Sequence, residues 1–209
     1  MRFATFELAG KAVWGLASDK GLHAVDATTL ARYPSLKAAI AADALTGIAS
    51  ALKDSSPSVS LEGAHFLPVI PDPEKILCIG LNYEAHRIEG GWPEVENPTI
   101  FGRFANSQIG HGQPMIKPKV SDKLDYEAEL AVIIGKPGRH IAEANAMDHV
   151  AGYACYNEGS VRDWQRHTTQ FTPGKNFIGT GAFGPCLVTK DEISDLGPLV
   201  MEARLNGEV

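Results

Sequence analysis

Beyond about residue 71 the chain consists of short apolar runs separated by glycine and proline. These runs are KILCIGLNY, NPTIFGRF, ELAVIIG, VAGYACY and GPCLVT. Runs of this length are typical of single β-strands, and the glycines and prolines between them favour turns. One short helix is expected in this part, over residues 141–148 (IAEANAMD). Many strands with so little helix indicate a β-rich α+β domain and not an alternating βαβ sheet.

The first 70 residues have a different texture. Residues 1–26 predict three short strands separated by turns at Ala9-Gly10-Lys11 and Asp19-Lys20-Gly21. Residues 35–53 are rich in Ala and Leu and begin with a serine, so they predict a helix, interrupted near Gly47. A proline-rich stretch follows and ends at Pro71-Asp72-Pro73. We therefore expect a small α+β domain over residues 1–70 and a second, catalytic domain over residues 71–209.

Composition excludes several classes of protein. The 209 residues include 19 Lys and Arg against 25 Asp and Glu, a net charge of −6, which argues against nucleic-acid binding. Three cysteines without a CxxC spacing fit neither a disulfide framework nor a zinc site. No signal-peptide core and no apolar stretch of membrane-spanning length is present. These observations predict a cytoplasmic protein that binds no membrane.

Three acidic residues alternate in the segment DYEAELAVIIG. Side chains of a strand alternate between its faces, so Asp125, Glu127 and Glu129 are expected on one face. The Cα atoms of Glu127 and Glu129 would then lie roughly 7 Å apart. Two such carboxylates repel each other unless a cation lies between them, and hard divalent ions prefer oxygen ligands. A solvated strand face is the alternative, but the apolar run after Glu129 favours a buried strand.

Three further segments carry side chains suited to chemistry. Glu158 ends the VAGYACYNE strand, and Arg162 and Gln165 follow three residues apart, on one face of any helical turn. His86 and Glu89 have the same spacing, in which a carboxylate can orient an imidazole that acts as a general base. A capped turn with surface charges and a chance His–Glu pair are the structural alternatives. The remaining candidate is Lys175, between a glycine and a strand, for which a surface position is the alternative.

The last residues contain a strong hairpin signal. The alternating segment LVMEARLNGEV contains Asn206-Gly207, a pair typical of two-residue hairpin turns, and stops two residues later. A hairpin needs a return strand. We therefore expect the second domain to be incomplete at its C-terminus, either because the chain is a fragment or because another chain supplies the strands.

Together these segments resemble the fumarylacetoacetate hydrolase family, in particular its acylpyruvate hydrolase-like members. The resemblance runs from about Pro71 to the end through five ordered blocks: GLNYEAHRIE, NPTIFGRF, KLDYEAELAVIIG, GYACYNEGSVRDWQ and GKNFIGTGAFGPCLVTKDEI. It implies a mixed β-roll catalytic domain preceded by a small α+β N-terminal domain. Two positions depart from the family pattern, since Glu158 replaces a common Asp and Ile178 stands where an Asp is often found. The family's glycine-rich loop beyond these blocks is not in the sequence.

The resemblance also implies roles for the candidate residues. Glu127, Glu129 and Glu158 correspond to the carboxylates that bind a divalent metal, Mg²⁺ or else Mn²⁺ or Ca²⁺. The lid histidine and its partner are His86 and Glu89. The remaining matches are the active-site lysine, Lys175, and the residues that contact substrate, Arg162 and Gln165.

The implied function is metal-dependent hydrolysis of a C–C bond in a 2,4-dioxo acid, through a metal-stabilised enolate. The substrate would be a small anionic 2-oxo acid, and the protein would form a homodimer. Fold and metal site do not fix the reaction. Oxaloacetate decarboxylation, isomerisation (including tautomerisation) or hydration within the same family, and an inert metal-binding protein, are the alternatives.

Overall fold

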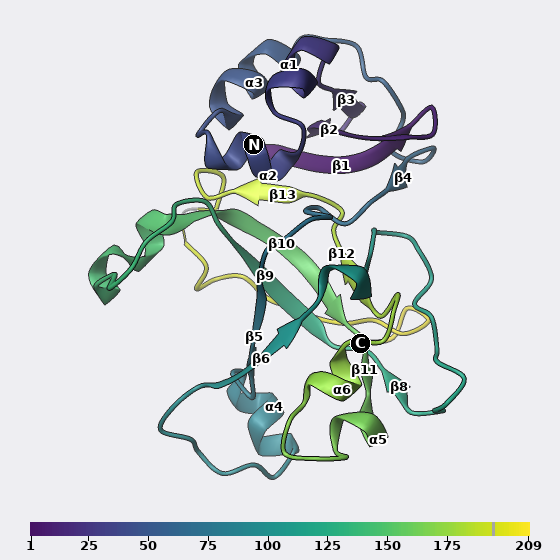
Figure 1. Cartoon of the computed structure of the whole chain (residues 1–209), viewed down its shortest axis with the longest axis vertical. Coiled ribbons are helices and arrows are strands. Elements are labelled where there is room, and N and C mark those ends of the chain that lie inside the picture. The colour runs from purple at the N-terminus through teal and green to yellow at the C-terminus, as the bar shows by residue number, and fades with distance from the viewer. Residues whose placement is uncertain (194) are drawn as a thin grey trace.

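A nine-stranded sheet organises the protein in the computed structural model, which describes residues 1–193 and 195–209. Seven strands follow the order β3-β2-β1-β13-β10-β12-β7, while β4 pairs with β1 and β9 pairs with β10. Figure 1 shows β9 and β10 crossing the middle of the molecule. The strands are β1 (Arg2–Leu8), β2 (Lys11–Ser18), β3 (Gly21–Ala24), β4 (His65–Phe66), β7 (Gln108–Ile109), β9 (Ala128–Ile134), β10 (Val150–Glu158), β12 (Gly181–Phe183) and β13 (Leu187–Thr189).

The N-terminal segment forms the three strands that its sequence predicts, followed by three short helices. These are α1 (Ala27–Arg32), α2 (Leu36–Ala41) and α3 (Leu45–Leu52). Ser35 caps α2, as expected, by accepting a hydrogen bond from the Ala38 amide at 3.2 Å. The predicted break near Gly47 was wrong, because Gly47 lies inside α3. The chain breaks instead at Asp43, which has a left-handed φ of 52°.

Helix α1 was missed from the sequence. Its Thr-containing segment ATTLAR has modest helix propensity. The helix is nevertheless capped by Asp26, whose carboxylate accepts a hydrogen bond from the Thr29 amide at 2.7 Å. An Asp three residues before an amide it can bind was the signal available in the sequence.

The main hydrophobic core lies between the helices and the sheet. Its most buried side chains, each no more than 1% exposed, include Phe3, Trp14, Leu36 and Leu187. Because β13 pairs antiparallel with both β1 and β10, the sheet continues from the N-terminal segment into the remainder of the chain. The division into folding units at residue 70 stays a prediction.

The five apolar runs are confirmed as strands. Three of the runs form β9, β10 and β13. The other two form β5 (Ile76–Gly80) and β6 (Thr99–Arg103), which pair as a two-stranded ribbon. Outside these runs, β8 (Leu124–Asp125) pairs with β11 (Ser160–Val161). Figure 1 shows the remaining α-helices gathered at the end of the molecule away from α1–α3. They are α4 (Glu84–Glu89), α5 (Arg162–Gln165) and α6 (Thr172–Lys175), and a short 3₁₀ turn, η1 (Ala105–Ser107), precedes β7. The structure is the predicted sheet-dominated α+β fold.

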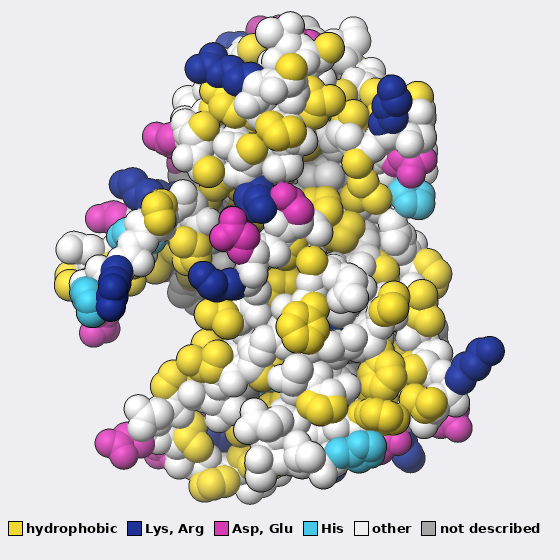
Figure 2. Space-filling view, viewed as in Figure 1, with side chains coloured by type: hydrophobic (Ala, Val, Ile, Leu, Met, Phe, Trp, Pro, Cys, Tyr) yellow, Lys and Arg dark blue, Asp and Glu magenta, His cyan; other side chains and the backbone are white. Residues whose placement is uncertain are grey.

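Two further predictions were a short helix in the segment between β9 and β10 and a hairpin turn near the end of the chain. The helix predicted over residues 141–148 is present as the 3₁₀ helix η2 (Glu143–His149), in which no side chain is buried. This segment projects from the body (Figure 1) and carries charged and histidine side chains (Figure 2), and with none of its side chains buried no packing against the core favours a longer α-helix. The predicted turn at Asn206-Gly207 is present, with φ of 54° and 88° and paired backbone of Leu205 and Glu208. No helix in the described residues is long and apolar enough to cross a bilayer.

Candidate active site

Three glutamates converge where β9 and β10 meet. Carboxylate oxygens of Glu127, Glu129 and Glu158 all lie within 4.8 Å of one another. The strand pairing explains this arrangement, because Glu129 in β9 faces Tyr156 in β10, and the Glu158 amide donates to the Glu127 carbonyl at 2.9 Å. Glu158 is 5% exposed. The predicted pair, Glu127 just before β9 and Glu129 within it, is therefore brought together with the predicted strand-end glutamate, in a cavity of about 40 Å³ that all three line.

Lys175 is drawn into this cluster and is not a surface lysine. It is 2% exposed, and its Nζ contacts Oε2 of Glu127 and lies 3.0 Å from Oε2 of Glu158. The preceding Gly174 makes this approach possible, because a Cβ there would lie 2.3 Å from the backbone nitrogen of Gln165. One ammonium group thus contacts two carboxylates and offsets part of their negative charge.

Arg162 supplies a second cation at the edge of the cluster. Its Nη2 lies 2.8 Å from Oε1 of Glu127 and 2.8 Å from Oδ2 of Asp125. Its Nη1 donates to Oε1 of Gln165 at 3.0 Å, so the spacing of these two residues brings them together as expected. Asp125 shares the acidic segment but pairs with Arg162 instead of joining the three glutamates.

The inner side of Glu158 is bounded by two residues that the sequence analysis did not single out. The Cys78 thiol donates to Oε1 at 3.2 Å, and Nη1 of Arg103 lies 3.5 Å from the same oxygen. These residues come from the paired strands β5 and β6, where Arg103 faces Ile76. A lone arginine at the end of the apolar run NPTIFGRF was the available signal, since a charge in such a run needs a buried partner.

The charges give the three glutamates different proton affinities. Burial, with the negative charges of Glu158 and Glu127, raises the pKa of Glu129 to about 7. Burial also acts to raise the pKa of Glu127, but the neighbouring Lys175 and Arg162 outweigh it, and that pKa is lowered. Burial in the same surroundings raises the pKa of the Cys78 thiol far above its usual range, so the thiol is a neutral donor.

Helix α4 carries the predicted lid pair. His86 is exposed and lines the cavity of the three glutamates, whereas Glu89 does not line it. Among the described residues no hydrogen bond or ion pair joins the two side chains. Glu84 contacts Arg87 at 4.0 Å instead, and the Arg87 guanidinium donates to the Trp92 carbonyl at 3.1 Å. The i, i+3 spacing therefore places His86 at the cavity without an orienting carboxylate in this conformation.

The donor set fits a hard divalent cation. Three carboxylates supply only oxygen ligands, and no other group of at least three potential metal-ligating side chains is found in the described residues. Two cations, Lys175 and Arg162, already lie against these carboxylates. The three carboxylates thus suit a cation, and the two positive side chains beside them suit an anionic substrate.

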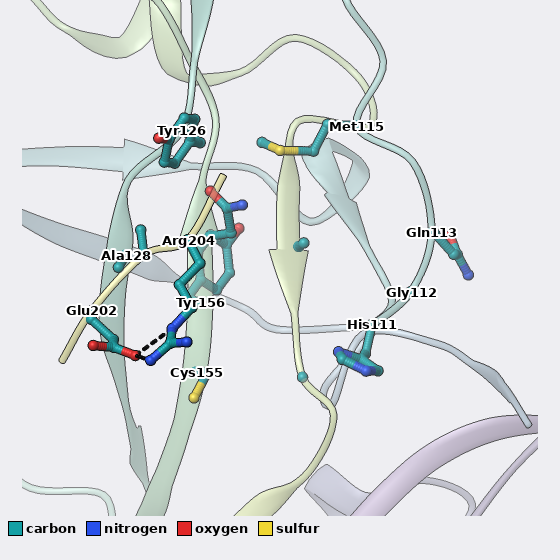
Figure 3. Close-up of a pocket in the computed structure, with 14 residues that line it drawn as sticks. His111, Gly112, Gln113, Met115, Tyr126, Ala128, Cys155, Tyr156, Glu202 and Arg204 are labelled. Atoms are coloured by element: carbon teal, nitrogen blue, oxygen red, sulfur yellow. Dashed lines mark hydrogen bonds and ion pairs between the residues drawn. The ribbon is translucent and has the colours of Figure 1, made fainter. Parts of the chain in front are cut away.

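A second, larger cavity of about 520 Å³ adjoins β10 (Figure 3). It is lined by Cys155 and Asn157, which alternate along β10 with Glu158, and its rim holds the ion pair of Glu202 and Arg204. This cavity contains no convergent set of carboxylates. The smaller, charged cavity is therefore the candidate active site.

A sequence model described as the C-terminal part of fumarylacetoacetate (FAA) hydrolase matches residues 75–209. The chain belongs to the fumarylacetoacetate hydrolase family. The mitochondrial oxaloacetate tautomerase of Xenopus laevis is 43% identical over 168 residues, which cover 79% of this chain and 53% of that protein. The chain thus spans about half the length of this curated relative of the family.

Solved structures share the fold of this family member. A fumarylacetoacetate hydrolase from psychrophilic Exiguobacterium antarcticum superposes with a TM-score of 0.73 at 30% identity, covering 91% of this chain and 67% of the other. A maleylpyruvate hydrolase from Sphingobium sp. SYK-6, solved with manganese(II) and pyruvate, has a TM-score of 0.74 at 24% identity, covering 93% and 69%. The family contains enzymes named for tautomerisation and for hydrolysis, so family membership alone does not choose the reaction.

Proposed function

We propose that this protein is a metal-dependent enzyme that interconverts the keto and enol forms of a small 2-oxo dicarboxylic acid of the oxaloacetate type. The observation that carries the proposal is the convergence of Glu127, Glu129 and Glu158 in one cavity with Lys175 and Arg162 beside them. Three carboxylates can hold a divalent ion, and the two cations suit the carboxylate and the oxyanion of such a substrate.

The three glutamates would hold Mg²⁺, Mn²⁺ or Ca²⁺. When bound, the ion supplies Lewis acidity that stabilises an enolate oxygen. Glu129 must lose its proton to act as a ligand, because a carboxylate binds metal in its ionised form. Glu127 is kept ionised by Lys175 and Arg162, so it is ready for this role at lower pH.

The remaining residues bind the substrate and handle the proton. The guanidinium group of Arg162 is planar, and its N–H donors match the geometry of a carboxylate. Gln165 orients this group, because its Oε1 accepts a hydrogen bond from Nη1 of Arg162 at 3.0 Å. Lys175 places positive charge where the enolate oxygen develops. His86, on the cavity side of α4, takes the proton from the carbon next to the 2-oxo group and delivers it to the enolate oxygen, which restores the neutral imidazole.

Two observations favour tautomerisation. The similarity to a named oxaloacetate tautomerase is 43% over most of the chain, well above the 30% to the fumarylacetoacetate hydrolase structure. The second observation is that no hydrogen bond or ion pair joins Glu89 to His86 in the described residues, whereas hydrolysis requires a base that is oriented to activate water. A proton shuttle between carbon and oxygen requires only a single acceptor.

Hydrolysis of the C–C bond in a 2,4-dioxo acid is the second candidate. It is favoured by the placement of His86 and Glu89 on one turn of α4 beside the cavity. A small movement of α4 that brought the two side chains into contact would supply the oriented base. Decarboxylation, which needs no water, would use the same ion and cations.

A substrate panel separates these candidates. The decay of enol-oxaloacetate, the cleavage of an acylpyruvate and the release of CO₂ from oxaloacetate are measured with Mg²⁺, Mn²⁺, Ca²⁺ or EDTA. We expect metal-dependent acceleration of enol decay in the wild type and in the surface control Glu62→Gln, and its loss in Glu129→Gln. Acylpyruvate cleavage without faster enol decay would establish the second candidate. No metal-dependent activity of any kind would leave the inert metal-binding protein.

Assembly and compartment belong to the same proposal. We propose a homodimer, supported by the apolar side chains of Leu130, Val132 and Ile134, which are 40%, 48% and 63% exposed along one face of β9. The three free cysteines support a reducing compartment such as the cytoplasm. Light scattering of the purified protein, and of the variant Val132→Lys, tests the dimer; an unchanged mass in the variant contradicts this face as the contact.

A further inference from the structure

Glu158, one of the three proposed metal ligands, has contacts on both of its carboxylate oxygens. Nζ of Lys175, a residue that lines the cavity, lies 3.0 Å from Oε2. The Cys78 thiol lies 3.2 Å from Oε1, and Nη1 of Arg103 lies 3.5 Å from the same oxygen. A glutamate has three rotatable side-chain bonds, so a carboxylate held on one oxygen only can still turn. Contacts on both oxygens restrict it to one orientation.

The guanidinium group of Arg103 is itself held in place by contacts with residues other than Glu158. Its side chain is fully buried, and it donates to the Gly159 carbonyl at 3.2 Å and to Oγ1 of Thr180 at 3.0 Å. Its guanidinium also lies 5.7 Å from the ring centre of Tyr156. Neither Arg103 nor Cys78 lines the cavity. Both residues therefore act on Glu158 from behind and are separate from the surface that substrate reaches.

From these contacts we propose that Cys78 and Arg103 are positioning residues that hold Oε1 of Glu158, so that its carboxylate is oriented for the divalent ion. This inference rests on the metal site of the proposed function. The thiol has a distinct advantage here. It donates to the carboxylate without adding a charge, whereas a further cation beside the ligand would oppose binding of the metal.

The orienting contacts have a measurable consequence. Partners that fix a metal ligand from outside the coordination shell commonly contribute about 10- to 100-fold to metal affinity. The thiol is a weak donor, so its loss belongs at the low end of that range. Truncation of Cys78 is expected to weaken metal binding about tenfold. Replacement of Arg103 by lysine keeps the charge but removes the two anchoring bonds, and is expected to have a similar effect.

Calorimetric titration of the metal-free protein with Mn²⁺ tests the proposal. Cys78→Ala is expected to bind about tenfold more weakly than the wild type, and Cys78→Ser, which keeps a donor, is expected to regain most of the affinity. Cys186→Ala is the matched control, because Cys186 is also half-buried and free, but no hydrogen bond joins it to Glu158 in the described residues. Its affinity for Mn²⁺ should equal that of the wild type.

A double-mutant cycle separates positioning from a general structural effect. In Glu158→Asp the carboxylate is one methylene shorter and is drawn away from Cys78. Adding Cys78→Ala to this variant should therefore change the Mn²⁺ affinity less than about twofold. If Arg103→Lys fails to fold, the Cys78 series decides alone.

Three outcomes would overturn the proposal. The first is a Cys78→Ala variant that binds Mn²⁺ as tightly as the wild type. The second is a Cys78→Ala substitution that lowers the Mn²⁺ affinity equally whether residue 158 is Glu or Asp. Both outcomes are compatible with the proposed metal site. The third is a wild-type protein that does not bind Mn²⁺, or whose binding survives Glu129→Gln, and this outcome removes the proposed metal site together with the positioning contacts.

Discussion

The ammonium group of Lys175 lies 3.0 Å from the carboxylate of Glu158, and both side chains are at least 94% buried. Each charge of such a buried ion pair requires the other, because removal of one partner would leave an uncompensated charge in the interior and strongly destabilise the folded state. Lys175 also contacts Glu127. The lysine thus contacts two of the three proposed metal ligands, Glu127 and Glu158, and holds them close together.

Removing this lysine is expected to destabilise the metal-free protein. In Lys175→Met, urea unfolding in EDTA at neutral pH should show a loss of about 3–5 kcal/mol, typical of a buried ion pair that loses one partner. The comparison is Lys37→Met, which breaks the exposed pair with Asp72 and should cost less than about 1 kcal/mol. Equal losses in the two variants would contradict the buried role of Lys175.

Arg162 is expected to contribute through geometry as well as charge. Arg162→Lys keeps the charge but loses the planar fork that meets Asp125, Glu127 and Gln165. We expect KM for the 2-oxo acid to rise at least about tenfold, the equivalent of one charge-assisted hydrogen bond, with Mn²⁺ affinity close to that of the wild type. Arg204→Lys at the larger cavity is the control. A normal KM in Arg162→Lys, or an equal rise in Arg204→Lys, would argue against this assignment.

The raised pKa of Glu129 predicts a pH-dependent stability of the metal-free protein. The folded pKa is about 7, above the ordinary 4.5, so the folded state binds the proton more tightly than the unfolded state. The stabilisation is complete below pH 4.5 and is lost as pH rises through 7. Relative to the wild type, Glu129→Gln should therefore be more stable at pH 8 than at pH 5. Urea midpoints in EDTA measure this, and a stability difference that does not vary with pH would refute it.

Leu187 tests whether the sheet unites the two predicted domains. Its side chain is fully buried in β13, in the same core cluster as Phe3 and Trp14 from the N-terminal strands. Leu187→Ala should cost about 2–5 kcal/mol, as core truncations do, and fluorescence and far-UV circular dichroism should still report a single transition. Two separate transitions would show that residues 1–70 and 71–209 unfold independently.

Much of the fold could be predicted because it depends on local patterns. The apolar runs are strands, and the alternation of Glu127 and Glu129 placed both carboxylates at one site with Glu158 from the next strand. The Asp43 break and the 3₁₀ form of η2 depend on single backbone conformations and on missing burial, which periodicity does not report.

The unpredicted part of the site depends on contacts between distant segments. Cys78 is 80 residues from Glu158, and their contact exists only because the β5–β6 ribbon packs behind the end of β10. The burial of Lys175 likewise results from the packing of α6 on α5. The spacing of His86 and Glu89 showed only that both share one turn of α4, and it does not determine where the two side chains point.

Calorimetric titration of the EDTA-treated protein with Mn²⁺ tests most directly whether the three glutamates form a divalent-metal site. We expect one bound ion per chain for the wild type and for Glu62→Gln, which changes an exposed glutamate outside the cavity. Glu127→Gln and Glu129→Gln should each bind at least about 10-fold more weakly, since the two remaining carboxylates hold a strongly hydrated ion poorly. If the variant that combines Glu127→Gln with Glu129→Gln binds Mn²⁺ as tightly as the wild type, the three glutamates are not the metal site and the ion binds elsewhere.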